Sequence, residues 1–404
     1  MSERTRILFV SHEASRTGAP MMLLHFLRWV REHASVEPQI AVLRGGPLVE
    51  EFAELGPTAV LGEVVDWPPP TRTEARLNRF GLSRASLTVQ RAQVRPLVAP
   101  LRDARIVYLN SSVSLRLLHH LPRVETAISH IHELQSSLPW SLRAQDPALM
   151  RSRIDHFVAA ADCVADNLVT SYGVDRADIT RLYEFIDTDR VVAPPTKLRD
   201  DIRAELGIPP DAFVVGGTGY ADWRKGIDLF VQMAKAAGEA GRHDIHFVWV
   251  GEIPGGFEGD QLDLDIEHAS VGSRLHLVGL QAKPFDWYRA FDVFALTSRE
   301  DPYPLVGLET ALLEVPMVCF DRSGGMIELV RRSLDEGAGE SGVIVPYLDV
   351  EAMADAVIAL VDDPDRRAAI GRQAARVVKR DHDVSVAAPQ LLQVLERVTK
   401  RQLF

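Results

Sequence analysis

The sequence has few cysteines, a deficit of positive charge and no long apolar run, and each shortage excludes a class of protein. Cys163 and Cys319 are the two cysteines among 404 residues, too few and too far apart for a disulfide framework or a zinc site, which fits a reducing cytosol. The net charge of -11 argues against a nucleic-acid-binding protein, because phosphate backbones require a basic footprint. The apolar run at residues 21–30 is interrupted by His25 and Arg28 and is too short to span a bilayer. The chain also begins without a signal-peptide pattern, so we expect a cytoplasmic protein that binds no nucleic acid.

The order of apolar segments predicts the fold class. Short β-branched runs alternate with longer amphipathic stretches, once in each half of the chain. Strands without polar alternation, separated by helices, are typical of a parallel sheet covered on both faces. We therefore predict an α/β protein with two doubly wound, Rossmann-like domains. The predicted boundaries are an N-terminal domain at 1–187, a linker rich in proline and charge at 188–198, a second domain at 199–380, and a C-terminal helix at 381–404 that can cross back to the first domain.

In such sheets ligands bind where strands end and helices begin. In the first half, Gly18 precedes a predicted helix whose first N–H groups suit an anion, although an ordinary strand–helix loop explains the same residues. His130 and His132 end a predicted strand and share one face, with Glu133 on the other. His132 can hydrogen-bond a substrate hydroxyl or phosphate, the two histidines can hold a metal, or either can be structural.

The second half opens with a glycine-rich turn. The segment G-G-T-G-Y-A-D-W-R-K-G lies at residues 216–226, after a predicted strand and before a predicted helix. Glycines such as Gly217 let a ligand approach the backbone, and Arg224 and Lys225 can neutralise phosphate. A solvated Arg–Lys pair is the alternative. The turn at residues 10–20 lacks the fingerprint G-x-G-x-x-G, and the turn at residues 216–226 lacks G-x-x-x-x-G-K-[ST].

A proline-rich turn at residues 298–305, S-R-E-D-P-Y-P-L, follows a predicted buried strand. Its two prolines have no N–H, so they restrict which backbone groups can face a ligand. The N–H groups that remain at the start of the following helix are predicted to bind diphosphate or sugar oxygens. They belong to Tyr303, Leu305 and Val306.

Two carboxylates accompany this turn. Glu309, about one turn into the predicted helix, can bind a diol through its two acceptor oxygens. Asp301 can bind a second diol. The alternative is that both acids merely complement the helix dipole.

Residues 214–370 resemble the donor-binding domain of retaining glycosyltransferases of family GT4, which have the GT-B fold. The resemblance rests on R-K-G before an amphipathic helix, on residues 291–330 and on residues 342–364. The E-x7-E motif of that family falls on Asp301 and Glu309, with aspartate in place of the first glutamate. In the first half, Gly18 matches the glycine loop of the family and His132 its histidine at the sugar. The resemblance extends over essentially the whole chain and is strongest in the second half.

The resemblance implies roles for these residues. Glu309 would bind the ribose hydroxyls, Asp301 the donor sugar and Lys225 the diphosphate. Asp301 and Lys225 would act in catalysis together with His132. The implied donor site consists of Gly18, Gly217, Arg224, Lys225, Asp301, Tyr303, Leu305, Val306 and Glu309. The family often has an arginine six residues before the lysine, where this chain has Gly219, so Arg224 or another cation must replace it, or the site differs.

The implied activity is retaining transfer of a hexose-type sugar from a nucleotide-diphosphate sugar to a hydroxyl of a glycan, lipid-linked or small-molecule acceptor, in polysaccharide or glycoconjugate biosynthesis. Cations and helix N-termini would replace a metal, so no metal or cofactor is expected. Two D-x-D triplets, at 187–189 and 263–265, lack a strand-end context and are interpreted as ordinary surface or linker acids. The alternatives are a GT-B-fold sugar-nucleotide epimerase and a non-catalytic nucleotide-sugar-binding protein.

A basic segment in the first half indicates a further partner. Between residues 72 and 105 eight arginines oppose only Glu74 and Asp103, in a chain that is acidic overall. Such a segment can dock on anionic lipid at the inner face of the membrane or on a lipid diphosphate acceptor, or it can be a solvated helix face. The arginines are Arg72, Arg76, Arg79, Arg84, Arg91, Arg95, Arg102 and Arg105.

Overall fold

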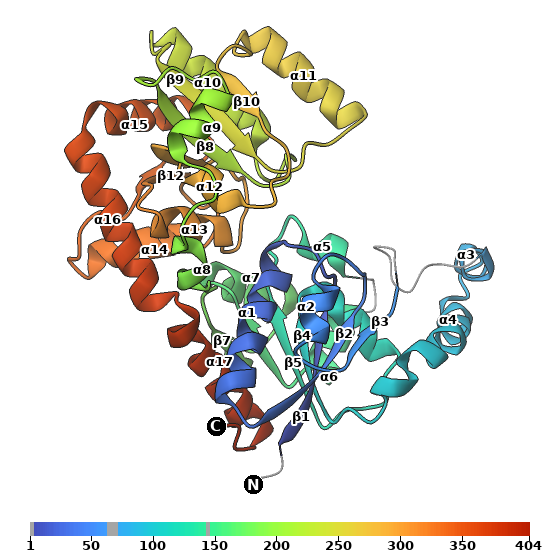
Figure 1. The fold of residues 1–404 in the computed structure, drawn as a ribbon. Helices are drawn as coiled ribbons and strands as arrows, with labels where there is room; N and C mark the ends of the chain where they lie inside the picture. The colour runs from blue at the N-terminus through green and yellow to red at the C-terminus, as the bar shows by residue number, and fades with distance from the viewer. Residues whose placement is uncertain (1–3, 63–71, 143–145) are drawn as a thin grey trace. The chain divides into compact units, whose positions relative to one another are not determined.

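A computed structural model describes residues 4–62, 72–142 and 146–404. The chain divides into two compact units, one formed by residues 1–183 and 384–404 and the other by residues 184–383 (Figure 1). The second unit is therefore one continuous stretch, inserted between two parts of the first. Each unit contains its own parallel sheet with helices between the strands, which is the two-domain α/β architecture predicted from the sequence.

The first unit is built on a seven-stranded parallel sheet of order β3-β2-β1-β4-β5-β6-β7. Its strands are β1 (Thr5–Ser11), β2 (Val36–Val42), β3 (Thr58–Val60), β4 (Ile106–Asn110), β5 (Thr126–Ile131), β6 (His156–Ala159) and β7 (Ile179–Arg181). Its α-helices are α1 (Gly18–His33), α2 (Val49–Ala53), α3 (Arg72–Arg79), α4 (Ser83–Val98), α5 (Leu138–Ser141), α6 (Asp146–Arg153), α7 (Asp162–Tyr172) and α17 (Val384–Thr399). Short 3-10 helices are η1 (Ala99–Leu101), η2 (Ser112–His119) and η3 (Arg176–Asp178).

The second unit is built on a six-stranded parallel sheet of order β10-β9-β8-β11-β12-β13. Its strands are β8 (Phe213–Thr218), β9 (Ile245–Val250), β10 (Leu275–Leu277), β11 (Val293–Leu296), β12 (Met317–Phe320) and β13 (Val343–Val345). Its helices are α8 (Thr188–Val192), α9 (Arg199–Glu205), α10 (Ile227–Glu239), α11 (Phe257–Ala269), α12 (Pro284–Tyr288), α13 (Leu305–Leu312), α14 (Met326–Asp335), α15 (Val350–Asp362) and α16 (Pro364–Asp381).

Strand composition explains both sheets. In β1, the run Ile7 to Val10 is completely buried, and β9 is buried along its whole length, as expected for strands covered on both faces. In the second unit, α10 and α15 pack against each other. Phe230 of α10 and Trp249 of β9 meet there edge to face, with ring centroids 5.3 Å apart.

The segment predicted as a linker, 188–198, contains α8 and belongs to the second unit. The Asp187 side chain accepts a hydrogen bond from the Arg190 N–H at 3.1 Å and so caps this helix. Helix capping thus explains Asp187 of the first D-x-D triplet. The second triplet lies on α11, where Asp263 and Asp265 are exposed. Neither triplet follows a strand.

The C-terminal helix α17 belongs to the first unit. It packs on α1 and buries an apolar stripe that includes Leu391 and Leu395. The chain end is fixed as well, because the Leu403 carbonyl accepts from the Ser35 N–H at 2.6 Å. All the strand-to-helix turns of one parallel sheet lie at its carboxyl edge, so each unit collects its predicted site residues there.

Candidate functional site

The turn after β11 is held by the turn after β12. The Asp301 N–H donates to the Ser323 carbonyl at 2.6 Å, and the Gly325 N–H donates to the Pro302 carbonyl at 2.8 Å. Gly324 lies between them with a φ of 144°, and a Cβ there would be 1.7 Å from the Asp301 carbonyl oxygen. Glycine is therefore required at position 324, and the backbone after β11 is fastened to its neighbour.

Helix α13 begins directly after this turn, as the sequence predicted. Pro304 is the N-cap residue, with φ -67° and ψ 123°, and Leu305 is the first helical residue. The first N–H groups of a helix have no partner within the helix, and Leu305 and Val306 stand in this first turn of α13. Their binding role remains a prediction. The Tyr303 side chain is buried.

Asp301 is buried and forms the centre of an ion-paired cluster with the half-buried Lys225 and Arg224. Its carboxylate lies 2.5 Å from Lys225 Nζ and 3.6 Å from Arg224 Nη1, and it accepts from Ser298 Oγ at 3.3 Å. Burial by itself would raise the pKa of Asp301, but the charges of Lys225 and Arg224 outweigh burial and lower that pKa. The carboxylate is therefore ionised. Asp301, Lys225 and Arg224, all predicted to contact a donor, are thus brought together. The two cations each form an ion pair with Asp301.

Gly219, which stands where the family pattern has arginine, lies under the stem of Lys225. Its φ is 133°, and a Cβ there would meet the Lys225 Cδ and Cε atoms at 3.0 Å. Its carbonyl accepts from the Trp249 indole N–H at 3.0 Å, and a Cβ on Gly251 would approach that same oxygen to 2.0 Å. A side chain at position 219 would therefore be strained by this φ and would push against the stem of Lys225. The cation that stands beside Lys225 is Arg224.

Restoring arginine at position 219 is expected to damage the site. Gly219→Arg places a side chain in the left-handed φ region and against Lys225, and such strain costs about 1–3 kcal/mol. We expect a lower denaturation midpoint and weaker binding of nucleotide sugars in thermal-shift titrations. Gly339→Arg is the control, because Gly339 also has a positive φ, 101°, with nothing within 4 Å of an added Cβ. Unchanged stability with tighter binding in Gly219→Arg would contradict this explanation.

Glu309 is the second acidic side chain of this region and lies in the second turn of α13. Burial raises its pKa to about 7, and the positive charge of Arg190 opposes part of that rise. Burial also raises the pKa of Tyr288, and the charge of Glu309 adds to that shift. At neutral pH the Glu309 carboxyl is therefore close to half ionisation, where it can accept from or donate to a diol.

Gly217 lies inside β8, where the absence of a side chain has a packing explanation. A Cβ at this position would come within 2.5 Å of the Trp249 ring and within 2.9 Å of the Phe230 ring. The two aromatic residues thus occupy the space beside the strand. The predicted role of Gly217 in donor binding remains a prediction next to this structural role.

Arg299 ties the glycine-rich turn to the proline-rich turn. Its guanidinium donates to both Asp228 carboxylate oxygens, at 2.8 and 2.7 Å, and lies over the Trp223 ring at 4.9 Å. Its backbone N–H donates to the Arg224 carbonyl at 2.8 Å. The positions of Arg224 and Lys225 therefore depend on Arg299, a residue of the turn at 298–305 to which the sequence assigned no role.

In the first unit, Asn110 connects two predicted site residues. Its Nδ2 donates to the carbonyl of Ala19, the residue after Gly18, at 2.8 Å, and its Oδ1 lies 2.9 Å from His132 Nε2. Because the amide nitrogen is committed to a carbonyl, the amide oxygen accepts and His132 carries a proton on Nε2. Asn110, fully buried at the end of β4, thus orients both the start of α1 and His132.

Replacing Asn110 by aspartate is expected to move the acid limb of the pH–rate profile upward by about 1–2 units, because a carboxylate beside His132 favours the imidazolium. The lost hydrogen bond to Ala19 should also lower the free energy of unfolding by about 1–3 kcal/mol. Asn167→Asp in α7 is the control, because it makes the same substitution away from the strand ends. A pH–rate profile of Asn110→Asp that overlies the wild-type profile would show that this side chain does not act on His132.

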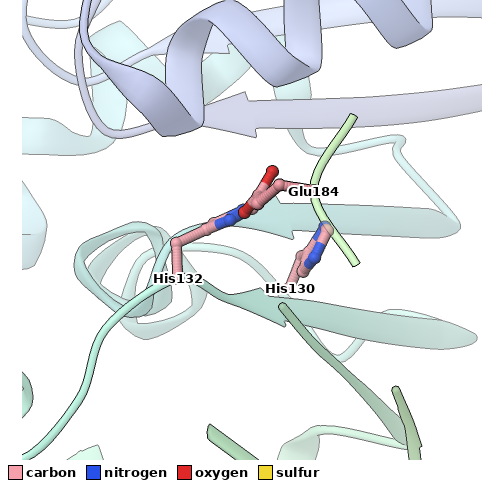
Figure 2. A group of neighbouring side chains, drawn as sticks. All are labelled: His130, His132 and Glu184. Atoms are coloured by element: carbon pink, nitrogen blue, oxygen red, sulfur yellow. The ribbon is translucent and has the colours of Figure 1, made fainter. Parts of the chain in front are cut away.

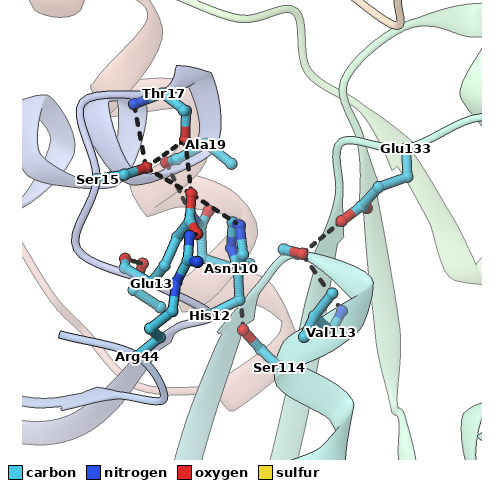
Figure 3. A network of polar contacts seen from close by, with 12 residues as sticks. His12, Glu13, Ser15, Thr17, Ala19, Arg44, Asn110, Val113, Ser114 and Glu133 are labelled. Atoms are coloured by element: carbon cyan, nitrogen blue, oxygen red, sulfur yellow. Dashed lines mark hydrogen bonds and ion pairs between the residues drawn. The ribbon is translucent and has the colours of Figure 1, made fainter. Parts of the chain in front are cut away.

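A second polar cluster follows β1 and fixes the turn before Gly18 (Figure 3). The Glu13 carboxylate accepts from Ser15 Oγ at 2.5 Å and from Thr17 Oγ1 at 3.1 Å, and it pairs with Arg44. Burial lowers the pKa of the neighbouring His12 imidazole. The turn from 12 to 17 is therefore held by side chains of its own and by the turn after β2.

Glu133 is a hydrogen-bond acceptor for the turn after β4. Its carboxylate accepts from the Ser112 N–H at 3.2 Å, from the His132 N–H at 2.9 Å and from the Ser111 hydroxyl. Ser111 has a φ of 97°, which is unusual for a residue other than glycine. These bonds compensate for that strained backbone directly beside Asn110.

His130 and His132 lie side by side, with ring centroids 4.0 Å apart (Figure 2). Tyr108 Oη lies 2.6 Å from His130 Nδ1, and burial lowers the pKa of His130 well below its ordinary value. This favours the structural interpretation of His130. The two imidazoles have nitrogens within 4.8 Å of one another, so the metal-binding interpretation of this pair remains a prediction.

The basic segment forms α3 and α4 at the β3 end of the first sheet (Figure 1). The turn between these helices exposes Phe80 and Leu82, with 76% and 52% of their surface accessible. In the described part of the chain, every helix falls short of the length and apolar content needed to cross a membrane. The side chains of Arg84 and Arg91 lie outside the described part of the structure. The other arginines of the basic segment are exposed: Arg72, Arg76, Arg79, Arg95, Arg102 and Arg105.

Known proteins resemble this chain in sequence and in fold. Residues 209–363 match the family model of glycosyl transferases group 1. The lipopolysaccharide core biosynthesis mannosyltransferase LpsB of Rhizobium meliloti is 31% identical over 218 residues, which are 53% of this chain and 60% of that protein. The D-inositol 3-phosphate glycosyltransferase 1 of Catenulispora acidiphila is 28% identical over 263 residues, 63% of this chain and 59% of that protein. The chain thus spans about three fifths of the length of these curated relatives.

This segment of the second unit is similar to the glycosyl transferases group 1 family. The solved structure of HepE from Anabaena in complex with UDP and glucose has a TM-score of 0.77, at 18% identity, over 97% of this chain and all of that chain. At this identity the similarity concerns the fold, and it confirms the GT-B architecture predicted from the sequence.

Proposed function

We propose that the protein is a retaining glycosyltransferase that moves a hexose-type sugar from a nucleotide-diphosphate sugar to a hydroxyl of a glycan, lipid-linked or small-molecule acceptor. The observation that carries the proposal is the cluster of the buried Asp301 with Lys225 and Arg224 at the carboxyl edge of the second sheet, within the segment that matches the family model. The names of LpsB, a mannosyltransferase, and of the HepE complex with UDP and glucose support a hexose donor.

In the proposed reaction, the bond between the anomeric carbon and the diphosphate oxygen breaks, and its electron pair leaves with the nucleoside diphosphate. The acceptor oxygen forms the new bond on the same face, and its proton passes to the departing diphosphate. Lys225, Arg224 and the first N–H groups of α13 stabilise the growing negative charge without a metal. Asp301 orients the sugar hydroxyls, Glu309 binds the ribose diol, and His132 remains the proposed sugar contact of the first unit.

A thermal-shift screen against UDP-, GDP-, ADP- and dTDP-sugars tests the donor, because a ligand that binds the native state raises the melting temperature. UDP-glucose is the first donor to test. Transfer is then followed with the donor that binds, and the anomeric configuration of the product is determined by NMR. Turnover that survives EDTA supports metal independence, whereas activity lost to EDTA and restored by a divalent ion would contradict it.

Two other functions predict different products with the same donor. A sugar-nucleotide epimerase returns a nucleotide sugar with altered configuration and needs no acceptor. A non-catalytic binding protein raises the melting temperature with the donor but shows no turnover with any acceptor. The family match of the second unit supports transfer over both.

We also propose a cytoplasmic enzyme that contacts the inner face of the membrane through α3 and α4. Exposed arginines around Phe80 and Leu82 combine attraction to anionic lipid with apolar side chains that can enter the headgroup region. Flotation with vesicles of anionic phospholipid should recover the wild type and not the Phe80→Ser/Leu82→Ser variant. Wild-type protein that stays at the bottom of the gradient would disprove the contact.

A further inference from the structure

Tyr303 and His382 form a buried contact to which the proposed reaction assigns no role. Their rings stack with centroids 5.3 Å apart and planes 29° apart, and Tyr303 Oη lies 3.2 Å from His382 Nε2. Both side chains are buried. Tyr303 belongs to the turn that presents Asp301 and α13, whereas His382 is 79 residues later in the chain. The contact therefore joins the proposed donor turn to a distant segment of the same unit.

The directions of the hydrogen bonds at His382 follow from its second partner. His382 Nδ1 lies 2.8 Å from the Glu184 carbonyl oxygen. A carbonyl oxygen only accepts, so the proton is on Nδ1, and a neutral imidazole then accepts at Nε2. The Tyr303 hydroxyl is the donor to that nitrogen. Two directed hydrogen bonds thus run from Tyr303 through His382 to Glu184.

His382 and Glu184 lie in the two segments of chain that connect the units. Glu184 is the first residue of the second unit and Asp383 is the last. The Ile186 N–H donates to the His382 carbonyl at 2.9 Å, Ile186 and Asp383 form a parallel bridge, and Thr188 Oγ1 donates to the Asp383 carboxylate. We call residues 184–188 and 382–383 the connecting pair. His382 is part of it.

We propose that His382 is a positioning residue for donor binding, which fastens the turn at 301–304 to the connecting pair through the hydroxyl of Tyr303. The opposite side of this turn is fastened by the backbone bonds to Ser323 and Gly325. Pro302 and Pro304 have no N–H with which to anchor the turn, so the Tyr303 side chain supplies an anchor on the His382 side. His382 itself touches no ligand in this proposal, which rests on the proposed function because the ligand is the nucleotide-sugar donor.

A double-mutant cycle with Tyr303→Phe and His382→Asn tests the link. Tyr303→Phe keeps the ring and removes the hydroxyl, while asparagine keeps a donor for Glu184 and removes the acceptor for Tyr303. We expect each single variant to weaken binding of the nucleotide sugar about three- to tenfold in calorimetric titration and to raise the donor KM, with the acceptor KM unchanged. The double variant should bind no more weakly than the weaker single variant, because both changes break one link.

Hydrogen exchange adds a readout that a purely structural contact would not change. In the wild type, the nucleotide sugar should slow amide exchange in the connecting pair, and in Tyr303→Phe it should not. Tyr172→Phe in α7 and His243→Asn, an exposed histidine of the second unit, are the control exchanges. Single effects on affinity that multiply in the double variant, or Tyr303→Phe with wild-type affinity, would overturn the proposal while leaving the proposed function intact. Wild-type protein that binds no nucleotide sugar would overturn both.

Discussion

Glutamine in place of Glu309 is expected to stabilise the protein at neutral and alkaline pH. Burial raises the pKa of Glu309 from 4.5 to about 7, so the folded state holds this proton more tightly than the unfolded chain does. The wild type therefore loses about 3 kcal/mol of unfolding free energy as the pH rises from about 4.5 through 7, whereas glutamine does not titrate. Urea denaturation of both proteins at acidic and alkaline pH measures this difference, which should grow with pH in favour of Glu309→Gln.

The same exchange is expected to weaken donor binding. A carboxylate accepts both hydroxyls of a diol and an amide oxygen does so less strongly, so affinity should fall about 10- to 100-fold at pH 8. In the wild type, affinity should decrease as the pH falls below about 7, because the carboxylate is the form that binds. Glu267→Gln, an exposed change on α11, is the control. A variant with full affinity, or a stability difference that does not depend on pH, would contradict the assignment of Glu309.

Loss of Lys225 is expected to affect both stability and turnover. Lys225→Met leaves the buried Asp301 carboxylate with Arg224 at 3.6 Å, and breaking a buried pair in this way costs about 3–5 kcal/mol. Turnover should fall about 100-fold or more, because a cation proposed to face the leaving group is removed. Lys235→Met is the matched control: Lys235 forms an exposed pair with Glu239 on α10 and should contribute less than about 1 kcal/mol.

A second substitution separates the two effects. Asp301→Asn combined with Lys225→Met removes both charges, so most of the lost unfolding free energy should return. Turnover should not return, since both proposed contacts to the donor are then missing. If the double variant is as unstable as Lys225→Met, the cost does not come from an unpaired Asp301. If Lys225→Met retains wild-type turnover, Lys225 has no part in transfer.

The fold could be read from the sequence because its signals are local. Buried strands such as β9 contain apolar residues without alternation, and the start of α13 at Leu305 follows from the proline before it. The boundaries of the two units, at 183/184 and 383/384, were harder to predict from the sequence. The segment 188–198 looked like a linker because it is rich in proline and charge, yet an aspartate cap and apolar contacts make part of it a helix of the second unit.

The sequence could predict which residues belong to the candidate site, but not which of them contact one another. Asp301 and Lys225 could each be selected from a turn after a strand, but their pairing joins positions 76 residues apart. Asn110 ends an apolar strand run, so the rule that ligands meet strand ends could have selected it. His382 carries no comparable signal, because it lies in a short segment after a helix and acts through Tyr303. Long-range partners of this kind leave no local pattern.

The bridge between Ile186 and Asp383 places the two ends of residues 184–383 next to each other. This stretch is uninterrupted and has its own six-stranded sheet and apolar core. A chimaera that exchanges this stretch with the corresponding stretch of a group 1 glycosyltransferase needs two junctions, and both lie next to the Ile186–Asp383 bridge. Under the proposed function, donor preference would then follow the exchanged stretch, and acceptor preference would follow the rest of the chain.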